Sequence, residues 1–455
     1  MQPKTLLQSI AAPFRQFIRN ESSSGILLIL SMVIALVWAN SPLSPAYFNL
    51  WDTPVSISIG EDSFSKPLLL WVNDGLMAIF FFTIGLEIKK EVIDGELSTP
   101  RKAALPLLAA VGGMVVPVGL FFLLQDAGPG MKGWGIPMAT DIAFSIGILS
   151  LLGSRVPLGM KVFLTAFAIV DDLGAIFVIT VFYSHEVHWG ALAMSGGILA
   201  FLFLCNHMFS IKRNWVYLLG GLGVWYYMFK SGIHPTIAGV LVAMAVPATN
   251  KLRARRFASR IEDFLDEFRM EKADGGGPFI PDPELHQLQD LRNRARSVLP
   301  PLQRLEYQLN DFVAFFVMPL FALANAGIKF GGSGEVFGQP LFMNIAVALL
   351  FGKVIGIVLF SWLAVKLRIA DLPLRTGWVQ MVGLGLLGGI GFTMALFISN
   401  LALEGAALLA QAKLGILIGS FVAGTAGYLL LHYTLREPLE EELESVAASG
   451  QEQTV

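Results

Sequence analysis

Charged residues and cysteine are scarce in this chain of 455 residues. Asp, Glu, Lys and Arg make up 15% of it, whereas 55% is apolar and the mean hydropathy is +0.64. This balance excludes an ordinary soluble globular protein. A single cysteine, Cys205, excludes a disulfide framework within the chain. The formal net charge of −2 does not indicate nucleic acid as a partner, and we expect the chain to lie in a lipid bilayer.

Twelve apolar stretches have about the length that an α-helix needs to cross a bilayer, which is roughly 20 residues. Polar residues, glycine and proline separate them. The sequence therefore predicts an all-α polytopic membrane protein with twelve transmembrane helices. The expected spans are 24–41, 68–88, 103–124, 134–151, 158–183, 189–206, 214–229, 232–248, 308–328, 341–366, 378–401 and 409–433.

The distribution of positive charge predicts the orientation of these spans. When the connections are numbered from the N-terminus, 26 of the 32 Lys and Arg residues lie on the starting side and five on the opposite side. Without the eleven in residues 251–304, the ratio is still 15 to five. Cytoplasmic loops carry the excess of Lys and Arg, so we expect a bacterial inner-membrane protein with both termini in the cytoplasm.

Four segments differ from the transmembrane domain expected at 24–436. Residues 1–23 have apolar side chains at helical spacing, which is typical of an interfacial amphipathic helix or of a surface helix that caps the bundle. Residues 53–67 alternate apolar and polar positions around a GEDS break, which predicts a short periplasmic β-hairpin. Residues 251–300 have the pattern of a charged cytoplasmic helical insert. The acidic residues 437–455 lack an apolar face and should be disordered.

Two adjacent acids, Asp171 and Asp172, interrupt the helix expected at 158–183 near its middle. A charged residue at that depth costs about 2.5–3.5 kcal/mol on insertion scales. This cost favours a functional pair over one that neighbouring backbone merely satisfies. Adjacent residues point about 100° apart around a helix, so we expect one carboxylate to face a water-filled route and the other a packed partner.

Lys353 is the one cation assigned to the interior of an expected span, and it is the candidate partner for these acids. A buried lysine retains its charge better beside a carboxylate, so its protonation should respond to whatever occupies the site. The alternative is a lysine that extends toward the membrane edge, because Lys353 stands not far from the expected start of its helix.

A third acid, Asp141, follows Pro137 and Thr140 in the fourth expected span. Proline removes a backbone donor and the flanking glycines loosen the helix, so this span should unwind near its middle. The eleventh span has a comparable weakness at three glycines: Gly388, Gly389 and Gly391. Interrupted helices in corresponding places are typical of transporters built from inverted repeats, here spans 3–5 and 10–12. A carboxylate offsets the positive ends of broken half-helices, and a cation the negative ends.

The candidate site offers oxygen ligands alone, from Asp171, Asp172, Asp141 and Thr140. Oxygen ligands favour hard cations such as Na⁺, Li⁺ or H⁺ over transition metals. Two close carboxylates in a low dielectric resist simultaneous ionisation, so cation binding and proton release are linked. The sequence therefore predicts exchange of Na⁺ or Li⁺ for H⁺, with Asp171 and Asp172 as the ligands of Na⁺ and with no cofactor. If more than one proton leaves for each Na⁺, the cycle responds to the membrane potential.

Six motifs resemble those of the NhaA-type sodium/proton antiporters, and the similarity extends from Gly25 to about Arg436. The motifs are ATDIAF at 139–144, LLGSRVP at 151–157, AIVDDLGAI at 168–176, FALANAG at 321–327, GK at 352–353 and GGIGFTM at 388–394. The resemblance implies twelve spans, with helices 4 and 11 broken and crossed, and a homodimer bridged by periplasmic hairpins. It also implies a secondary transporter rather than an enzyme, serving sodium and pH homeostasis.

Roles for particular residues also follow from the resemblance. It implies that Asp172 and Asp171 carry the cation and the protons, that Asp171 pairs with Lys353, and that Asp141 and Thr140 support the crossing chains.

The family has a pH-sensing group at the cytoplasmic funnel, and this chain matches part of it. The matching positions are Glu87, Glu91, Glu306, Asp74 and His234. The chain departs from the family near Glu306, because a basic residue and two histidines expected there are replaced. The replacing residues are Gln303, Tyr307 and Asn310. Without the resemblance, the three glutamates read as ordinary charges at the membrane edge.

Three other classes of protein fit the sequence less well. A cation-coupled symporter for an organic solute needs a roomy polar cavity, and the spans contain no cluster of Asn, Gln, Arg or Trp to form one. Intramembrane aspartyl proteolysis needs two acids on separate helices around a water. Asp141 and Asp172 satisfy that count, but no GxGD pattern occurs. The cost of four charged groups inside the membrane argues against a structural scaffold.

Overall fold

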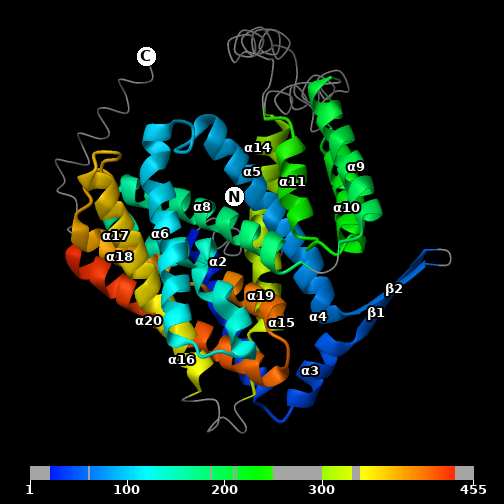
Figure 1. Cartoon of the computed structure of the whole chain (residues 1–455), viewed down its shortest axis with the longest axis horizontal. Helices are drawn as coiled ribbons and strands as arrows, with labels where there is room; N and C mark the ends of the chain where they lie inside the picture. The colour runs from blue at the N-terminus through cyan, green and yellow to red at the C-terminus, as the bar shows by residue number, and fades with distance from the viewer. Residues whose placement is uncertain are drawn as a thin grey trace, which may run out of the picture.

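The computed structural model describes residues 21–59, 62–184, 187–208, 211, 213–248, 300–329 and 339–435. The expected N-terminal amphipathic helix, charged insert and acidic tail lie outside or almost entirely outside these residues. The described chain is mostly helical, and a single hairpin among these residues projects from the helical body (Figure 1).

In addition to the hairpin, the first part of the chain forms a series of helices and one short turn. In order they are α2 (Glu21–Ala39), α3 (Ser44–Asp52), α4 (Leu68–Trp71), the π-helical η1 (Val72–Leu76), α5 (Met77–Asp94), α6 (Pro100–Leu124), the 3-10 helix η2 (Pro129–Met138), α7 (Ile142–Ser150), the turn η3 (Gly153–Arg155), α8 (Leu158–Phe182), α9 (Trp189–His207) and α10 (Asn214–Lys230). The short α11 (Ile237–Ala245) follows.

The second half repeats the alternation of long and interrupted helices. Its elements are α14 (Pro301–Phe312), the π-helical η4 (Val313–Val317), α15 (Met318–Asn325), α16 (Pro340–Val347), the π-helical η6 (Ala348–Gly352), α17 (Lys353–Lys366), α18 (Trp378–Gly388), α19 (Phe392–Ala402) and α20 (Ala406–Thr434).

Proline marks the start of several helices. The helices α6, α14 and α16 begin at Pro100, Pro301 and Pro340. An N–H group at the first helical position makes no intrahelical hydrogen bond, so proline, which has no N–H, loses no bond there. The fixed φ of proline also suits the helix. The π-helical segments, by contrast, have no evident sequence signal. They widen continuous helices, and such segments are frequent at functional sites.

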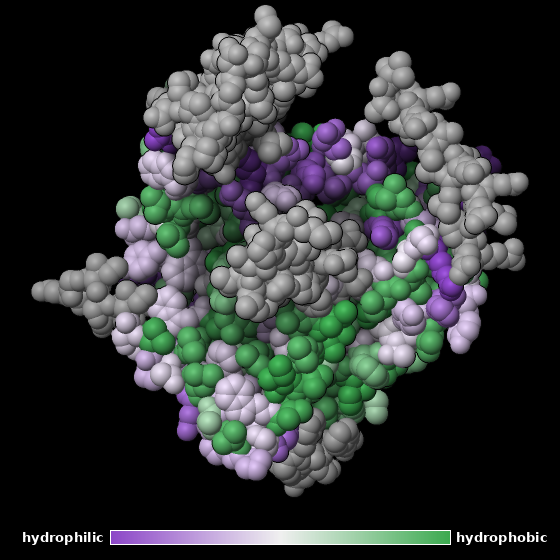
Figure 2. All heavy atoms as spheres, turned by 180° about the vertical axis from the view of Figure 1, so that it is seen from behind, coloured by the Kyte–Doolittle hydropathy of each residue, from purple (hydrophilic) through white to green (hydrophobic). Residues whose placement is uncertain are grey.

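Seven helices in the described ranges are long and apolar enough to cross a bilayer, or nine if each of two bent pairs is one span. The bent pairs are Ser23–Ala39 with Ser44–Asp52, at 112°, and Trp378–Gly388 with Phe392–Ala402, at 44°. Seen from behind, apolar side chains cover a broad part of the surface beneath a hydrophilic end (Figure 2). Together these features define a multi-pass membrane protein.

Three of the twelve expected spans are shorter than a full crossing. The span at 134–151 is divided between η2 and α7 by an extended segment. The span at 214–229 corresponds to α10, which has 17 residues. The span at 232–248 contracts to the nine residues of α11, because the chain turns at Gly232, whose φ is 82°.

The hairpin expected at 53–67 is confirmed. Strands β1 (Pro54–Ile59) and β2 (Asp62–Pro67) pair antiparallel, with Val55 opposite Lys66. At its base, Nε1 of Trp71 donates to the carbonyl oxygen of Val55 at 3.1 Å. The hairpin is therefore tied to the helix that follows it.

Two large apolar cores and a small third cluster at Ile328, Phe342 and Leu414 fill the described part of the bundle. The larger surrounds α8 and the helices that cross it, and the smaller lies between α5, α9, α10, α11 and α14. The helices α6 and α17 approach each other closely: a Cβ atom on Gly112 would lie 2.3 Å from the carbonyl oxygen of Gly356. Small residues at such crossings let membrane helices pack backbone to backbone.

We expect Gly112→Ala to lower the thermal unfolding temperature of the purified protein, because the added methyl forces α6 and α17 apart. Overpacking of this kind costs about 1–3 kcal/mol. Gly119→Ala, on the same helix, is the control, since its Cβ would meet no described heavy atom within 4 Å. Equal melting temperatures for the two variants would contradict the close approach.

Candidate functional site

An ion pair between α8 and α17 forms the centre of the candidate site. Asp171 and Lys353 are fully buried, and Nζ of Lys353 donates to both carboxylate oxygens of Asp171, at 2.7 and 2.9 Å. The same amine lies 5.7 Å from the centroid of the Phe167 ring. Lys353 thus makes the contact expected from the sequence and does not extend toward the membrane edge. It follows directly on the π-helical η6.

Asp172, the neighbouring acid, has no such partner. Its side chain is fully buried, and neither carboxylate oxygen accepts a hydrogen bond from the residues that the structure describes. The charges that act on it include those of Asp171, Asp141 and Lys353. Buried polar atoms without a partner are rare in proteins, and an unpaired buried ion is costly. Asp172 is therefore the group of this site with unmet binding capacity, which a proton or a cation would satisfy.

Two interrupted helices meet beside the acids. Between η2 and α7 the chain is extended at Ala139 and Asp141, and the helical direction breaks again between α18 and α19. The backbone N–H of Asp141 donates to the carbonyl oxygen of Ile390 at 2.6 Å, so the two breaks are in contact. A Cβ atom on Gly391 would lie 3.0 Å from the carbonyl oxygen of Ala139. Glycine is required there because two backbones approach each other closely.

The carboxylate of Asp141 caps two helices at once. Its Oδ1 accepts the N–H of Phe144 at 3.0 Å, in the first turn of α7. Its Oδ2 accepts the N–H of Thr393 at 3.1 Å, in the first turn of α19, and also the hydroxyl of Thr393. The first N–H groups of a helix have no intrahelical acceptor and carry partial positive charge. One buried carboxylate thus satisfies two helix N-termini.

Hydroxyl groups satisfy the other broken end. The Oγ1 of Thr140 donates to the carbonyl oxygen of Gly388 at 2.7 Å, and the Oγ of Ser145 donates to that of Leu387 at 2.7 Å. These carbonyls belong to the last turn of α18, where the helix does not continue to supply donors, and that of Leu387 also accepts the N–H of Ile390 at 3.1 Å. Thr140 therefore supports the crossing, and it also lies against Asp171.

A third hydroxyl, Oγ of Ser420 on α20, accepts the N–H groups of Gly391 and Phe392 at 3.2 and 3.1 Å. Sequence reasoning missed Ser145, Thr393 and Ser420 because serine and threonine are common in apolar helices, where they bond to their own backbone. Of these three residues, Thr393 could have been identified from the sequence, because it stands two residues after Gly391.

The other residues expected at the breaks have packing roles. Pro137 is buried within η2. A Cβ atom on Gly388 would lie 2.7 Å from Cδ1 of Ile357, and one on Gly389 would lie 2.9 Å from the carbonyl oxygen of Leu349. These positions therefore need small residues so that α17 and its π-helical start can pass beside the break.

The five residues matched to the pH-sensing group lie in two places instead of one. Glu306 accepts Nζ of Lys90 at 2.7 Å, and Glu87 interacts electrostatically with both. Glu91 accepts the N–H of Glu96 at 2.9 Å, just beyond the end of α5. Lys90 was not among the expected members.

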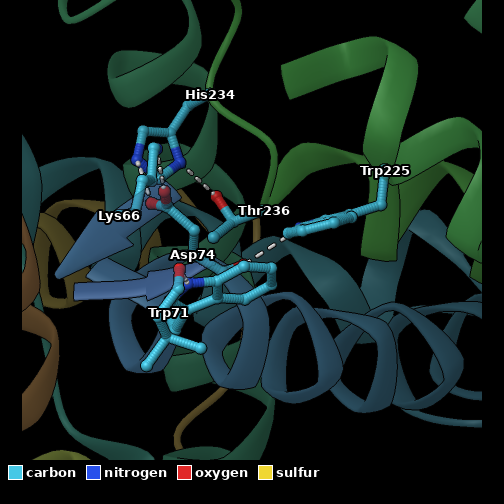
Figure 3. A network of polar contacts seen from close by, with 7 residues as sticks. Lys66, Trp71, Asp74, Trp225, His234 and Thr236 are labelled. Atoms are coloured by element: carbon cyan, nitrogen blue, oxygen red, sulfur yellow. Dashed lines mark hydrogen bonds and ion pairs between the residues drawn. The ribbon is translucent and has the colours of Figure 1, made fainter. Parts of the chain in front are cut away.

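Asp74 and His234 form the second place, at the base of the hairpin (Figure 3). Nζ of Lys66 donates to Oδ2 of Asp74 at 2.9 Å, and Nε2 of His234 lies 3.8 Å from Oδ1. Nδ1 of His234 is 2.8 Å from the hydroxyl of Thr236. Asp74 precedes Glu87 by about 13 residues of helix, which is about 20 Å of helical rise. The two places are thus at opposite ends of one helix.

A resident metal centre is not evident in the described part of the chain, where no three His, Cys, Asp or Glu side chains are arranged to hold a metal ion.

The fold and the site define a multi-pass membrane protein with an ionisable centre at the crossing of two interrupted helices, an arrangement typical of secondary transporters. The family described as Na⁺/H⁺ antiporter 1 matches residues 15–431, and the chain belongs to this family of transporters. The resemblance seen in the motifs is thereby confirmed.

Individual relatives are similar over nearly the whole chain. The Na(+)/H(+) antiporter NhaA of Oleidesulfovibrio alaskensis is 48% identical over 435 residues, which cover 94% of this chain and 96% of the relative. The Na(+)/H(+) antiporter NhaA 1 of Saccharophagus degradans is 44% identical over 427 residues, covering 93% and 92%. The Na(+)/H(+) antiporter NhaA of Koribacter versatilis is 45% identical over 426 residues, covering 93% and 92%.

The double cap predicts an order of stability. Asp141→Ala removes the acceptors of both helices, and each lost cap costs about 0.5–2 kcal/mol, whereas Thr393→Val removes one hydroxyl donor only. We expect the melting temperature of the purified protein to fall from wild type to Thr393→Val and further to Asp141→Ala. Asp126→Ala, at an exposed acid, is the control. An Asp141→Ala variant as stable as this control would refute the double cap.

Proposed function

We propose that the protein exchanges cytoplasmic Na⁺ or Li⁺ for external protons, with Asp171 and Asp172 as the binding groups. The observation that carries this proposal is the carboxylate of Asp172, which is buried without a hydrogen-bond partner among the described residues. It stands beside an acid that is already paired with Lys353. The names of the relatives, which are Na⁺/H⁺ antiporters, support the choice of ions.

Competition between the two ions at Asp172 produces the exchange. A protonated carboxyl is neutral, and a carboxylate with bound Na⁺ is also neutral, so both states tolerate a buried site. The empty, ionised carboxylate is the costly state. The site would switch from one side of the membrane to the other mainly when Na⁺ or a proton is bound. This couples the exit of Na⁺ to the entry of protons and limits leakage of either ion.

Asp171 and Lys353 make the exchange electrogenic. A Na⁺ ion at Asp172 attracts Asp171 as well, and Lys353 then loses its carboxylate partner. An ammonium group left without a partner in an apolar wall gives up its proton. One proton from Asp172 and one from Lys353 thus leave for each Na⁺ that binds, so each cycle moves one net charge and responds to the membrane potential.

The crossed breaks give the site alternating access. The half-helices α7 and α19 are short, with nine and eleven residues, and the N-terminal end of each is held by the carboxylate of Asp141. We assign twelve spans, because the three short expected spans added to the nine longer ones make twelve. The two breaks would then fall on corresponding members of inverted repeats, which places the site near the middle of the bilayer.

Regulation and assembly complete the proposal. The acidic group of Glu87, Glu91 and Glu306 at one end of α5 would adjust activity to cytoplasmic pH. The hairpin, which projects from the body, would pair with a second copy in a homodimer (Figure 1). Asp74 and His234, at its base, would take part in the same pH regulation.

In everted vesicles, the wild-type protein should dissipate a preformed pH gradient when Na⁺ or Li⁺ is added. Asp172→Asn should abolish this response, because an amide neither ionises nor releases a proton. Asp126→Asn, an exposed acid outside the site, should respond like the wild type. Full activity of Asp172→Asn, with equal protein in the membrane, would sink the assignment.

In proteoliposomes, an imposed membrane potential should change the rate of exchange, because each cycle moves a net charge. The rate should rise when the potential draws the excess protons inward and fall when it is reversed. The measurement is proton flux at a fixed Na⁺ gradient, with the potential set by K⁺ and valinomycin. A rate indifferent to the potential would contradict release of two protons for each Na⁺.

A further inference from the structure

Three asparagines form a buried ladder of amide side chains away from the ion site. Nδ2 of Asn325, the last residue of α15, donates to Oδ1 of Asn73 on η1 at 2.8 Å. Nδ2 of Asn400 on α19 donates to Oδ1 of Asn325 at 2.8 Å. Asn325 is fully buried, Asn73 is nearly so and Asn400 is half-buried. The ladder therefore joins three helices that are distant in sequence.

The central amide, Asn325, uses both kinds of polar atom. Besides its bond to Asn73, Nδ2 donates to the carbonyl oxygen of Phe321 at 3.0 Å, and Oδ1 is the acceptor for Asn400. A buried amide is costly unless its hydrogen bonds are made. A satisfied network of this kind permits one relative placement of its helices, whereas apolar side chains would tolerate several.

One face of α19 connects the ladder to the ion site. Thr393, Phe397 and Asn400 stand at positions i, i+4 and i+7, which lie on the same side of a helix. Thr393 bonds to Asp141 at the start of α19. Phe397 meets the ring of His234 in the middle, at 5.3 Å and 86°. Asn400, which meets the ladder, lies about 10 Å from Thr393 along the helix axis.

In the middle of this face, the ring of Phe397 also meets those of Phe81 and Phe321, at 5.8 and 6.4 Å. Ring contacts are less directional than hydrogen bonds, so they fix the axial position of a helix less sharply. Directional bonds from this face to other elements occur at Thr393 and Asn400. The ladder is thus well placed to hold the far end of the half-helix whose near end is capped at the site.

We infer that Asn325 and Asn400 are positioning residues, which set the axial position of α19 so that Thr393 meets Asp141. This inference rests on the proposed function, because the placement of Thr393 affects ion affinity only if the acids beside it bind the transported ions. Neither asparagine touches the ions; each acts through α19.

The test compares Asn400→Leu with the wild type in Na⁺-driven proton flux in proteoliposomes. Loss of the ladder bond should raise the apparent KM for Na⁺ by about threefold to tenfold, the factor associated with one hydrogen bond. The maximal rate per folded protein should be retained. Ser399→Ala is the matched control, since its Oγ bonds to the carbonyl oxygen of Leu396 within α19 itself, at 2.8 Å. Its KM should stay at the wild-type value.

A double-mutant cycle separates positioning from a general loss of stability. If the ladder acts by placing Thr393, then Asn400→Leu should raise KM much less in a Thr393→Val background than in the wild type. Sites this far apart without shared partners normally have additive effects. An unchanged KM in Asn400→Leu, or additive effects in the double variant, would overturn the inference. If Asn400→Leu does not accumulate in the membrane, Asn400→Ala takes its place in the same cycle.

The same four proteins give a readout that does not depend on transport. The fall in melting temperature of the double variant Asn400→Leu/Thr393→Val should be smaller than the sum of the falls measured for the two single variants. If the wild-type protein does not exchange Na⁺ for H⁺, the proposed function is contradicted. The coupling of the melting temperatures then still tests whether the ladder positions α19. Additive shifts in melting temperature would count against the ladder even if exchange is normal.

Discussion

The bonds from one carboxylate, Asp141, to the N-termini of α7 and α19 are the interaction on which the rest of the site depends. A helix broken inside a bilayer exposes backbone groups where no water can satisfy them. Asp141 supplies the acceptors, while Thr140 and Ser145 supply donors to the end of α18. Without these bonds the ends of the interrupted helices would keep buried backbone groups that lack hydrogen-bond partners.

This arrangement divides three acids among three tasks. Asp141 is occupied by helix ends, and Asp171 is occupied by Lys353. Asp172 alone among them is left without a described partner. The site thus concentrates its unmet demand for positive charge on a single carboxylate, next to an acid that is paired with Lys353. A pair of equal, unpaired acids would instead share one proton and discriminate poorly between ion-loaded and empty states.

Much of this was predictable from the sequence, and the reasons are physical. Burial in lipid demands long apolar runs, and the cost of ionised groups there made Asp171, Asp172 and Lys353 conspicuous. The π-helical η6 before Lys353 was not predictable, because it results from packing between distant helices. The separation of Asp74 from Glu87 was also missed, since matched motifs indicate which residues matter and not where the fold places them. Hydroxyl residues such as Ser420 could not be recognised as part of the site from the sequence. A serine in an apolar helix can bond to its own backbone, so its burial costs little free energy.

The strength of the individual bonds also suits a mobile site. A single hydrogen bond contributes about 1 kcal/mol net, so caps and ladders can be exchanged one at a time without unfolding the bundle. A long continuous helix would have to break many backbone bonds together to move its centre. The half-helix α19 has few directional bonds on its inner face, at Thr393 and at Asn400, one near each end. The eleven residues between these bonds are continuous helix, and we therefore infer that a change in the position of one end acts on the other.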